Sequence, residues 1–421
     1  MFYFSMLNFP KINHFNNLNL INTMNKIIIQ NLQNNLQNFE DKLLLEIGKK
    51  YPFQPFPVVF DKSRFQKLID KTNAIIEFLG TEKYYQEQNI ESWFLPSKKL
   101  TKNDFIGCVD FFVNERTEKL IEVNLMTPGY TGLIGLFDTI FTQNFPYEAS
   151  YLVNENIEKK IVESVTENGK YRKIAITVSH LSSSDFYRAH YLYIEKVFRK
   201  FGFEATICFA CDIQSNELGE IIFQDIKYDR IFNLLIVLTW EQNQNEFASF
   251  TEFYKKNPHA IFPNPLGMKL AYKPLLSHLY QADLSSYGIS EKNVALIKDS
   301  LLKAAPLSAF NSVNDIKQYF DGQNIIIKPN LGYHTKGIIA KPTDKQLEEA
   351  LTNKINYVVQ EFFEQESITK IDDSKENEAF EIEIRMAFIN GKFEWTVAFV
   401  EQVNQDGTKS NYSINPILVR E

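Results

Sequence analysis

Residues 325–338 read Ile-Ile-Ile-Lys-Pro-Asn-Leu-Gly-Tyr-His-Thr-Lys-Gly-Ile. The β-branched run predicts a strand, the two glycines predict a loop, and a second strand follows. Gly332 and Gly337 let the backbone approach a ligand closely, and the N–H groups of such a loop can bind phosphate oxygens. Lys328, on the strand that enters the loop, adds a positive charge that can reach a phosphate. Taken alone, the segment is equally compatible with an ordinary β-hairpin.

A second informative stretch lies some two hundred residues earlier in the chain. Residues 105–113 and 119–125 are rich in Ile, Val and Phe and are joined by a polar link, which predicts a hairpin. Alternate side chains of a strand share a face, so Glu122 and Asn124 point the same way, and Asp110 can meet them from the paired strand. Mg²⁺ prefers such oxygen ligands together with phosphate oxygens and waters. The alternative is a solvated polar face, although unpaired carboxylates among apolar residues are unfavourable.

Two more segments add candidates. Residues 381–391 read Glu-Ile-Glu-Ile-Arg-Met-Ala-Phe-Ile-Asn-Gly, in which Arg385 lies among apolar residues on a predicted strand. A guanidinium there suits a transferring phosphate or a substrate carboxylate. The alternative is an internal ion pair with Glu381 or Glu383. Residues 357–363 read Tyr-Val-Val-Gln-Glu-Phe-Phe, which by themselves indicate an ordinary buried strand.

Together these segments resemble the ATP-grasp ligases. In that family the lysine-and-glycine segment normally comes first and the Glu-x-Asn segment last, so the reversed order here suggests a circular permutation. The resemblance covers roughly residues 100–145 and 172–421. Three positions depart from the family pattern: Thr335 replaces a glycine of the loop, Glu401 replaces a second arginine, and an Asn with paired glycines is reduced to Asn411 or Asn415.

The resemblance implies a role for each candidate residue. It implies two catalytic residues, Arg385 at the transferred phosphate or a substrate carboxylate and Lys328 at the α- or β-phosphate. It also implies Mg²⁺ or Mn²⁺ held by Asp110, Glu122 and Asn124. An early lysine of the family corresponds to Lys269, with Lys273 as the weaker candidate. The residues implied in ATP binding are Lys269, Lys328, Gly332, Thr335, Lys336, Gly337, Gln360, Glu361, Phe362 and Phe363.

The activity that the resemblance implies is ADP-forming ligation of a carboxylate to an amine through an acyl phosphate. The expected cofactors are ATP and Mg²⁺, and the expected partners are small-molecule or peptide carboxylates and amines. Two alternatives stay open: a non-catalytic nucleotide-binding relic of the fold, and a phosphotransferase without the ligation step.

Composition narrows the class of protein further. The chain has 421 residues, 44% of them apolar, and a formal charge of −7, which argues against a nucleic-acid-binding face. Three cysteines are too few for a disulfide framework, and Cys208 and Cys211 lack the further ligands of a zinc site, so we expect buried thiols in a reducing cytoplasm. No stretch reaches the length of a membrane span. A homodimer is compatible with the sequence.

The expected fold class is α+β and α/β: an ATP-grasp fold of permuted order with a Rossmann-like accessory domain. A strand–helix rhythm over residues 172–265, with strands expected at 173–180, 204–211, 219–224 and 230–240, predicts a parallel sheet. The apolar spacing is helical from about residue 25 to residue 79, with a Pro-rich break at 51–57 and a second helical run at 64–79, and further helices are expected over 268–281 and 344–351. The expected divisions are a poorly ordered extension at 1–24, a helical segment with the metal hairpin at 25–150, the accessory domain at 151–265, the nucleotide subdomain at 266–364, and catalytic strands at 365–421 completed by 100–145.

Overall fold

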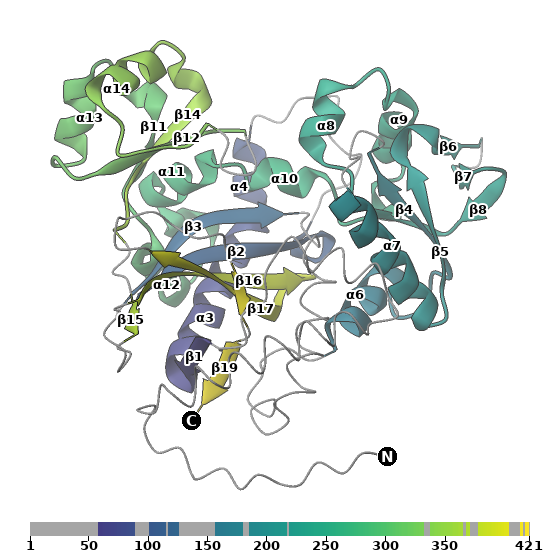
Figure 1. Cartoon of the computed structure of the whole chain (residues 1–421). Coiled ribbons are helices and arrows are strands. Elements are labelled where there is room, and N and C mark those ends of the chain that lie inside the picture. The colour runs from purple at the N-terminus through teal and green to yellow at the C-terminus, as the bar shows by residue number, and fades with distance from the viewer. Residues whose placement is uncertain are drawn as a thin grey trace, which may run out of the picture.

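The computed structural model describes residues 58–88, 101–114, 117–125, 156–179, 185–216, 219–331, 337–364, 368–370, 378–403, 413–415 and 417–420. Figure 1 shows a central antiparallel sheet with one α/β unit at the upper left, around β12, and another at the right, around β4. We call residues 304–364 the lysine-loop lobe and residues 157–262 the parallel-sheet lobe.

The central sheet joins segments that are far apart in the sequence. Its strands run in the order β18-β17-β16-β2-β3, with β15 paired to β16. The bounds are β2 Ile106–Val113, β3 Glu118–Leu125, β15 Ile368–Lys370, β16 Glu378–Ile389, β17 Lys392–Val403 and β18 Ser413–Asn415. The hairpin at 105–125 is therefore confirmed, and it pairs antiparallel with β16. Asn390 and Gly391 form the turn between β16 and β17, and both residues have positive φ, at 51° and 74°.

The hairpin contains a β-bulge that decides which side chains share a face. Asp110 lies opposite Glu122, whereas the next residue, Phe111, lies opposite Leu120, so Ile121 is the extra residue on β3. Leu120 consequently packs in the same core cluster as Phe111 and Val123. Glu122 and Asn124 then point to the opposite face of the sheet.

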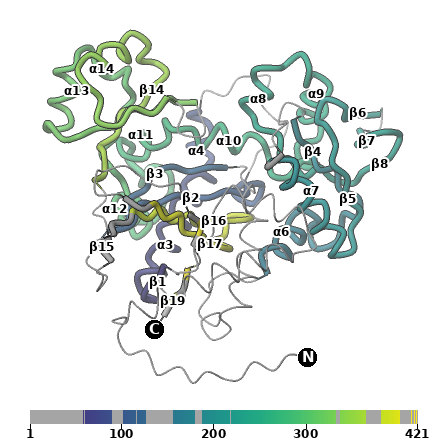
Figure 2. The backbone as a smooth tube through the Cα atoms, viewed as in Figure 1, coloured from purple at the N-terminus to yellow at the C-terminus, as the bar shows by residue number. Residues whose placement is uncertain are grey.

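Helix α3 covers the core face of this sheet. It spans Lys62–Leu79, begins at Asp61, whose side chain accepts a hydrogen bond from the Arg64 N–H, and contacts β16 and β17. Just before it, β1 (Val58–Asp61) pairs in parallel with β19 (Ile417–Arg420). Figure 2 shows how this pair brings the two ends of the described chain together. The helical run expected at 64–79 is thus confirmed. Strand β1 was not expected, because it depends on pairing with a distant strand, and residues 25–57 lie outside the described part. Helix α4 (Glu82–Glu87) follows.

The lysine-loop lobe is a four-stranded sheet in the order β11-β14-β12-β13. Its elements are β11 Ala304–Pro306, α13 Val313–Tyr319, β12 Ile325–Pro329, β13 Ile339–Ala340, α14 Asp344–Leu351 and β14 Tyr357–Glu361. Helix α14 matches its prediction, whereas α13 was not expected. The helix expected over 268–281 is wrong as a single element, because Pro274 starts a new helix: α10 spans Leu266–Leu270 and α11 spans Pro274–Gln281. Helix α12 (Glu291–Ser300) leads into β11.

The parallel-sheet lobe confirms a parallel sheet within residues 172–265. The strand expected at 219–224 is not part of it, because β7 (Ile221–Phe223) pairs antiparallel in a separate small sheet. Strands β4 (Lys173–Val178), β5 (Glu204–Phe209), β9 (Arg230–Asn233) and β10 (Ile261–Phe262) pair in parallel, in the order β10-β9-β4-β5. The strand expected over 230–240 is wrong beyond Asn233, since α8 follows; a short apolar run does not separate buried strand from helix. The helices are α6 Ile157–Thr166, α7 Asp185–Lys200, α8 Val237–Gln242 and α9 Ala248–Lys256, and a small sheet holds β6 Gln214–Ser215, β7 Ile221–Phe223 and β8 Ile226–Tyr228.

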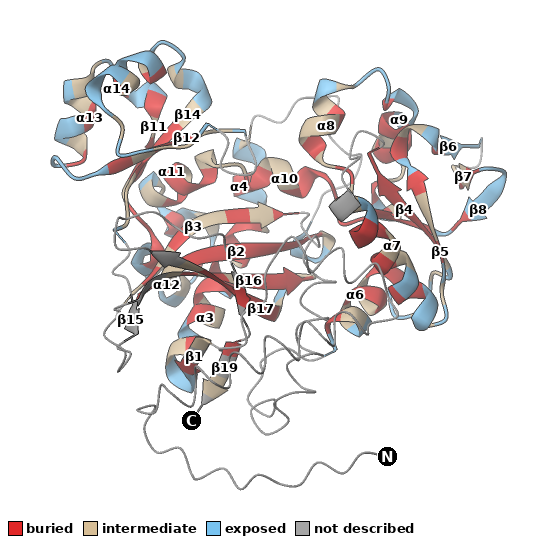
Figure 3. Ribbon diagram, viewed as in Figure 1, coloured by how far each residue is buried: buried red, intermediate tan, exposed pale blue. Residues whose placement is uncertain are grey.

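Buried residues concentrate in the sheets and on the helix faces that cover them (Figure 3). One cluster packs α3 and one face of the central sheet, and a second packs the other face against the parallel-sheet lobe through residues such as Cys108 and Ala387. The lysine-loop lobe has a separate core around Ile327 and Val359. In the described part of the chain, none of the helices combines the length and the apolar character needed to cross a membrane.

Candidate functional site

The polar side chains of the hairpin and of β16 meet on one face of the central sheet. In the strand register Asp110 lies opposite Glu122 on one side and Arg385 on the other. Glu383 lies two residues from Arg385 on the same strand and therefore on the same face. The structure thus brings together the hairpin candidates and the arginine that the sequence placed more than two hundred residues away.

Arg385 and Asp110 form a two-point ion pair. Nε of Arg385 donates to Oδ1 of Asp110 at 2.8 Å, and Nη2 donates to Oδ2 at 2.7 Å. Asp110 is fully buried, and the Arg385 side chain is 15% exposed. Such bidentate geometry fixes the orientation of a guanidinium. The internal ion pair considered for Arg385 is therefore present, with Asp110 as the main partner and Glu383 as a longer contact at 3.4 Å.

Glu122 and Asn124 lie beside this pair. The Asn124 amide donates to Oε1 of Glu122 at 2.8 Å and to Oδ2 of Asp110 at 3.1 Å. Burial by itself raises the pKa of Glu122, but the charge of Lys273 and the hydrogen bond from Asn124, together with more distant cations, lower it overall. Glu122 is consequently held as a carboxylate that faces cations.

Glu383 is a further member of the site. Burial and the neighbouring carboxylates Asp110, Glu122 and Glu401 raise its pKa to about 8, against the opposing effect of Arg385. The sequence considered Glu383 only as an ion-pair partner, although its spacing of two from Arg385 already placed both on one face.

Lys328 connects the lysine-loop lobe to the hairpin. Its Nζ donates to Oε1 of Gln360 at 2.7 Å and to the backbone oxygen of Ile121 at 3.1 Å. Ile121 is the bulge residue, and a bulge leaves its extra residue outside the regular ladder. Burial lowers the pKa of Lys328 to about 8, although Glu122 and Glu383 raise it. Lys328, the predicted phosphate-binding lysine, therefore contacts the residue next to Glu122, the predicted metal-binding carboxylate.

The end of β14 lies next to the same hairpin. Glu361 donates its backbone N–H to the Lys303 oxygen at 2.8 Å, and Phe362 donates to the Asn324 oxygen at 2.8 Å. The Phe363 ring stacks on Phe112 of β2, with ring centroids 6.4 Å apart and planes inclined by 16°. Glu361, Phe362 and Phe363 therefore directly follow Gln360, whose side chain accepts from Lys328.

The two lysine candidates of the α10–α11 segment separate clearly. Lys269 forms an ion pair with Glu241 of α8 and lies over the Tyr272 ring. Lys273 is the lysine whose charge acts on Glu122 and Lys328. The ion pair with α8 makes this difference, and the sequence alone does not predict that contact. Lys273 is therefore the stronger candidate.

Part of the glycine loop lies outside the described residues, namely Gly332, Thr335 and Lys336. Gly337 has φ +76°, and an added Cβ would meet the Pro329 ring at 3.4 Å. This positive φ explains the glycine at the end of the loop.

Comparison with known proteins identifies the fold. No protein-family model matches the sequence, and no curated protein matches it. A glutathione synthetase-like effector from Globodera pallida, in apo form, superposes with a TM-score of 0.58 and 12% identity, over 88% of this chain and 90% of that chain. This chain has the mixed α/β fold of ATP-grasp-like ligase structures. At this identity the likeness shows the fold alone.

Other solved structures match with TM-scores below 0.5. A putative gamma-glutamylcysteine synthetase from Methylobacillus flagellatus has a TM-score of 0.44 and 12% identity, over 85% of this chain and 86% of that chain. The ATP-grasp ligase PsnB, complexed with a minimal precursor, has a TM-score of 0.32 and 13% identity, over 59% of this chain and 90% of that chain.

The side chains on this face offer only a few oxygen ligands for a hard cation such as Mg²⁺. Among the described residues, no group of three or more His, Cys, Asp or Glu side chains is arranged to hold a metal ion. Glu122 and Asn124 nonetheless supply a carboxylate and an amide oxygen, and Mg²⁺ is often bound by one or two carboxylates together with phosphates and waters. Asp110, the third ligand that the sequence suggested, has both oxygens on Arg385 and is placed to orient that guanidinium.

Proposed function

We propose that this chain is an ATP- and Mg²⁺-dependent ligase that joins a carboxylate to an amine through an acyl phosphate. The observation that carries the proposal is the contact between Lys328 and the Ile121 oxygen. It brings Lys328 next to Glu122, while Arg385 lies on the far side of β2 from Glu122. The fold that the chain shares with a glutathione synthetase-like effector supports the proposal.

Each part of the site has a proposed task. Lys328, Lys273 and the loop that contains Gly332, Thr335, Lys336 and Gly337 would contact the phosphates. The segment from Gln360 to Phe363 would contact the nucleoside. Mg²⁺ or Mn²⁺ would be held by Glu122 and Asn124 and would neutralise charge on the phosphate oxygens. Arg385, oriented by Asp110, would meet the transferred phosphoryl group or the substrate carboxylate.

The proposed reaction has two steps. A substrate carboxylate oxygen attacks the γ-phosphorus of ATP, and the bond to the β,γ-bridging oxygen breaks to release ADP. An amine then attacks the acyl carbon of the acyl phosphate, loses a proton and expels inorganic phosphate, which leaves an amide. The chain contributes charge and positioning in both steps, without a covalent nucleophile. Small molecules or peptides would supply the carboxylate and the amine.

A second candidate, binding of nucleotide without ligation, has one observation in its favour. Glu401 lies directly opposite Glu381 in the β16–β17 register, so two acids stand where the resemblance implies a second arginine. This difference concerns the substrate side of the site more than the ATP side. The permuted order of the two segments also stays an interpretation, which the pairing of β2 with β16 supports.

Trapping with hydroxylamine separates these candidates. Purified protein is incubated with ATP, Mg²⁺, hydroxylamine and panels of carboxylic acids, and hydroxamate and ADP are measured. We expect hydroxamate to form, and we expect Glu122→Gln to reduce it about 10²–10³-fold, as for other groups that stabilise transition-state charge. Glu163→Gln, on the exposed side of α6, serves as the control and should keep full activity.

The other outcomes identify the alternatives. ADP release without hydroxamate would indicate a phosphotransferase or ATPase. Neither product, combined with retained ATP binding, would indicate a nucleotide-binding relic. Full activity of Glu122→Gln would exclude Glu122 as a metal ligand.

A further inference from the structure

The turn end of the hairpin divides its side chains between two neighbours. Because of the bulge at Ile121, Glu118 points with Leu120 toward α3, whereas Lys119 lies opposite Phe112 and points with it toward the lysine-loop lobe. Two adjacent residues thus tie one strand to two different parts of the molecule.

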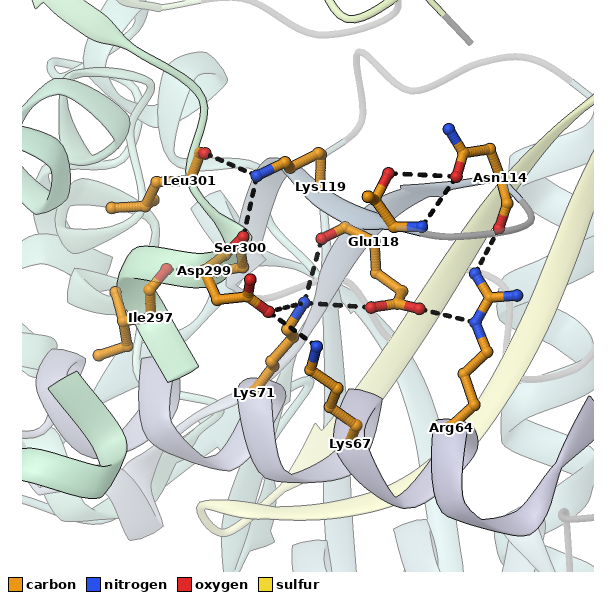
Figure 4. A network of polar contacts seen from close by, with 11 residues as sticks. Arg64, Lys67, Lys71, Asn114, Glu118, Lys119, Ile297, Asp299, Ser300 and Leu301 are labelled. Atoms are coloured by element: carbon orange, nitrogen blue, oxygen red, sulfur yellow. Dashed lines mark hydrogen bonds and ion pairs between the residues drawn. The ribbon is translucent and has the colours of Figure 1, made fainter. Parts of the chain in front are cut away.

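Glu118 anchors the hairpin to α3 (Figure 4). Its carboxylate accepts from Nε of Arg64 at 2.7 Å and from Nζ of Lys71 at 3.2 Å, and both Glu118 and Lys71 are almost fully buried. Lys71 also pairs with Asp299 at the end of α12, at 3.0 Å. Lys67 pairs with the same carboxylate at 2.9 Å from a half-exposed position. These ion pairs therefore hold the turn end of the hairpin against α3.

Lys119 contacts the segment that leads into the lysine-loop lobe. Its Nζ donates to the backbone oxygens of Asp299 at 2.9 Å and Leu301 at 3.3 Å, as Figure 4 shows. These oxygens lie at the C-terminal end of α12, where a cation is favourable. Two residues further, the Lys303 N–H donates to the Glu361 carboxylate at 3.3 Å, and the Lys303 oxygen accepts from the Glu361 N–H. Lys119 is therefore linked through Leu301–Lys303 to the end of β14.

The neighbouring residue on β2 contacts the same lobe independently. Phe112 stacks on Phe363, just beyond the end of β14. With the Lys328 contact to Ile121, the hairpin meets the lobe at two points, and Lys119 adds a third contact to the segment that leads into the lobe. The Lys119 contact involves neither Glu122 nor Asn124, so its removal leaves the proposed ligands in place.

We infer that Lys119 is a positioning residue that sets the separation between the carboxylate hairpin and the lysine-loop lobe, and thereby couples metal binding to nucleotide binding. The inference rests on the proposed function, because it assigns the metal to the hairpin and the nucleotide to the lobe. A metal-bound nucleotide contacts both parts, whereas a nucleotide without metal contacts mainly the lobe. If the hairpin is held less firmly against the lobe, the affinity for the metal-bound nucleotide should fall, and the affinity for the metal-free nucleotide should not.

The test measures the affinity for a non-hydrolysable ATP analogue by titration calorimetry, with Mg²⁺ and with EDTA. The ratio of the two dissociation constants is the coupling. We expect Lys119→Met to reduce this ratio about tenfold, within the usual range of coupling between sites, and we expect Lys119→Arg to restore most of it. Lys67→Met is the matched control, since Lys67 pairs with Asp299 without contacting the hairpin or the lobe in the described structure.

An unchanged ratio in Lys119→Met, or an equal loss in Lys67→Met, would overturn the inference. If Lys119→Met does not fold, Phe112→Leu replaces it, with the same expected loss of coupling and the same contradicting result. Wild-type protein that binds no analogue in either buffer would instead overturn the proposed function, so the two failures are distinguishable.

Discussion

His190, on α7, is a buried histidine without a polar partner. It is 2% exposed, and neither ring nitrogen has a hydrogen-bond partner in the part of the chain that the structure describes. Burial lowers its pKa to about 4, from an ordinary value of 6.5. The folded protein therefore keeps this ring neutral at pH values where the unfolded chain takes up a proton.

The sign of the resulting pH dependence follows from that difference. Above pH 6.5 neither state binds the proton and stability is unaffected; between pH 6.5 and 4 only the unfolded state binds it, so stability falls as the pH falls. We expect His190 to contribute a loss of about 2 kcal/mol between pH 7.5 and 5. Urea unfolding at both pH values should show a smaller loss in His190→Leu than in wild type. Exposed His259, changed to Gln, is the control; an equal loss in wild type and His190→Leu would contradict the argument.

Single residues of the site were predictable to different degrees. Spacing of two on a strand was enough to place Glu122 beside Asn124, and the same spacing joins Glu383 to Arg385. The pairing of Asp110 with Arg385 depends on strands from opposite ends of the chain, which no local pattern encodes. The exchange of Lys269 for Lys273 has a similar cause, because it depends on where α8 places Glu241.

Among the elements, the β2–β3 hairpin depends on a buried charge pair for its attachment to α3. Lys71 is 1% exposed and Glu118 is 3% exposed. Removing one partner of such a pair leaves the other charge buried and incompletely compensated. We expect Lys71→Met to lower the free energy of unfolding by about 3–5 kcal/mol. Chemical denaturation measures this change.

Lys67→Met supplies the comparison for this prediction. Lys67 lies one turn earlier on α3 and pairs with Asp299, but about half of each side chain is exposed. Exposed pairs contribute at most about 1 kcal/mol. Similar losses in Lys67→Met and Lys71→Met would show that burial does not set the strength of this network.

Element boundaries show where sequence patterns are sufficient. Helix α14 and the hairpin were predicted closely, because each has clear periodicity and a polar turn or a capping residue at its limits. The bulge at Ile121 was not predictable, since it leaves the residue types of the strand unchanged. It nevertheless decides that Glu118 points toward α3 and that Glu122 lies beside Asp110 on the other face.

Across the molecule as a whole, the central sheet joins segments from distant parts of the chain. The pairing of β2 with β16 puts an early hairpin and the late strands into a single layer, and Lys328 connects that layer to the lysine-loop lobe. The sequence predicted this meeting only through a family resemblance. Composition and periodicity gave the strands but not their neighbours. The pairing of β1 with β19, which joins the ends of the described chain, had no signal in the sequence at all.

The central claim is that Lys328 belongs to a nucleotide site built jointly with the hairpin. Its most direct test is titration calorimetry of Lys328→Met with a non-hydrolysable ATP analogue and Mg²⁺. Lys345→Met serves as the control, since Lys345 lies on α14 of the same lobe and its side chain is 85% exposed. A lysine that contacts phosphates in the ground state contributes to affinity, so we expect Lys328→Met to bind the analogue at least about tenfold more weakly than wild type and Lys345→Met to bind it equally well. Unchanged affinity in a folded Lys328→Met protein would remove this lysine from the site and contradict the account.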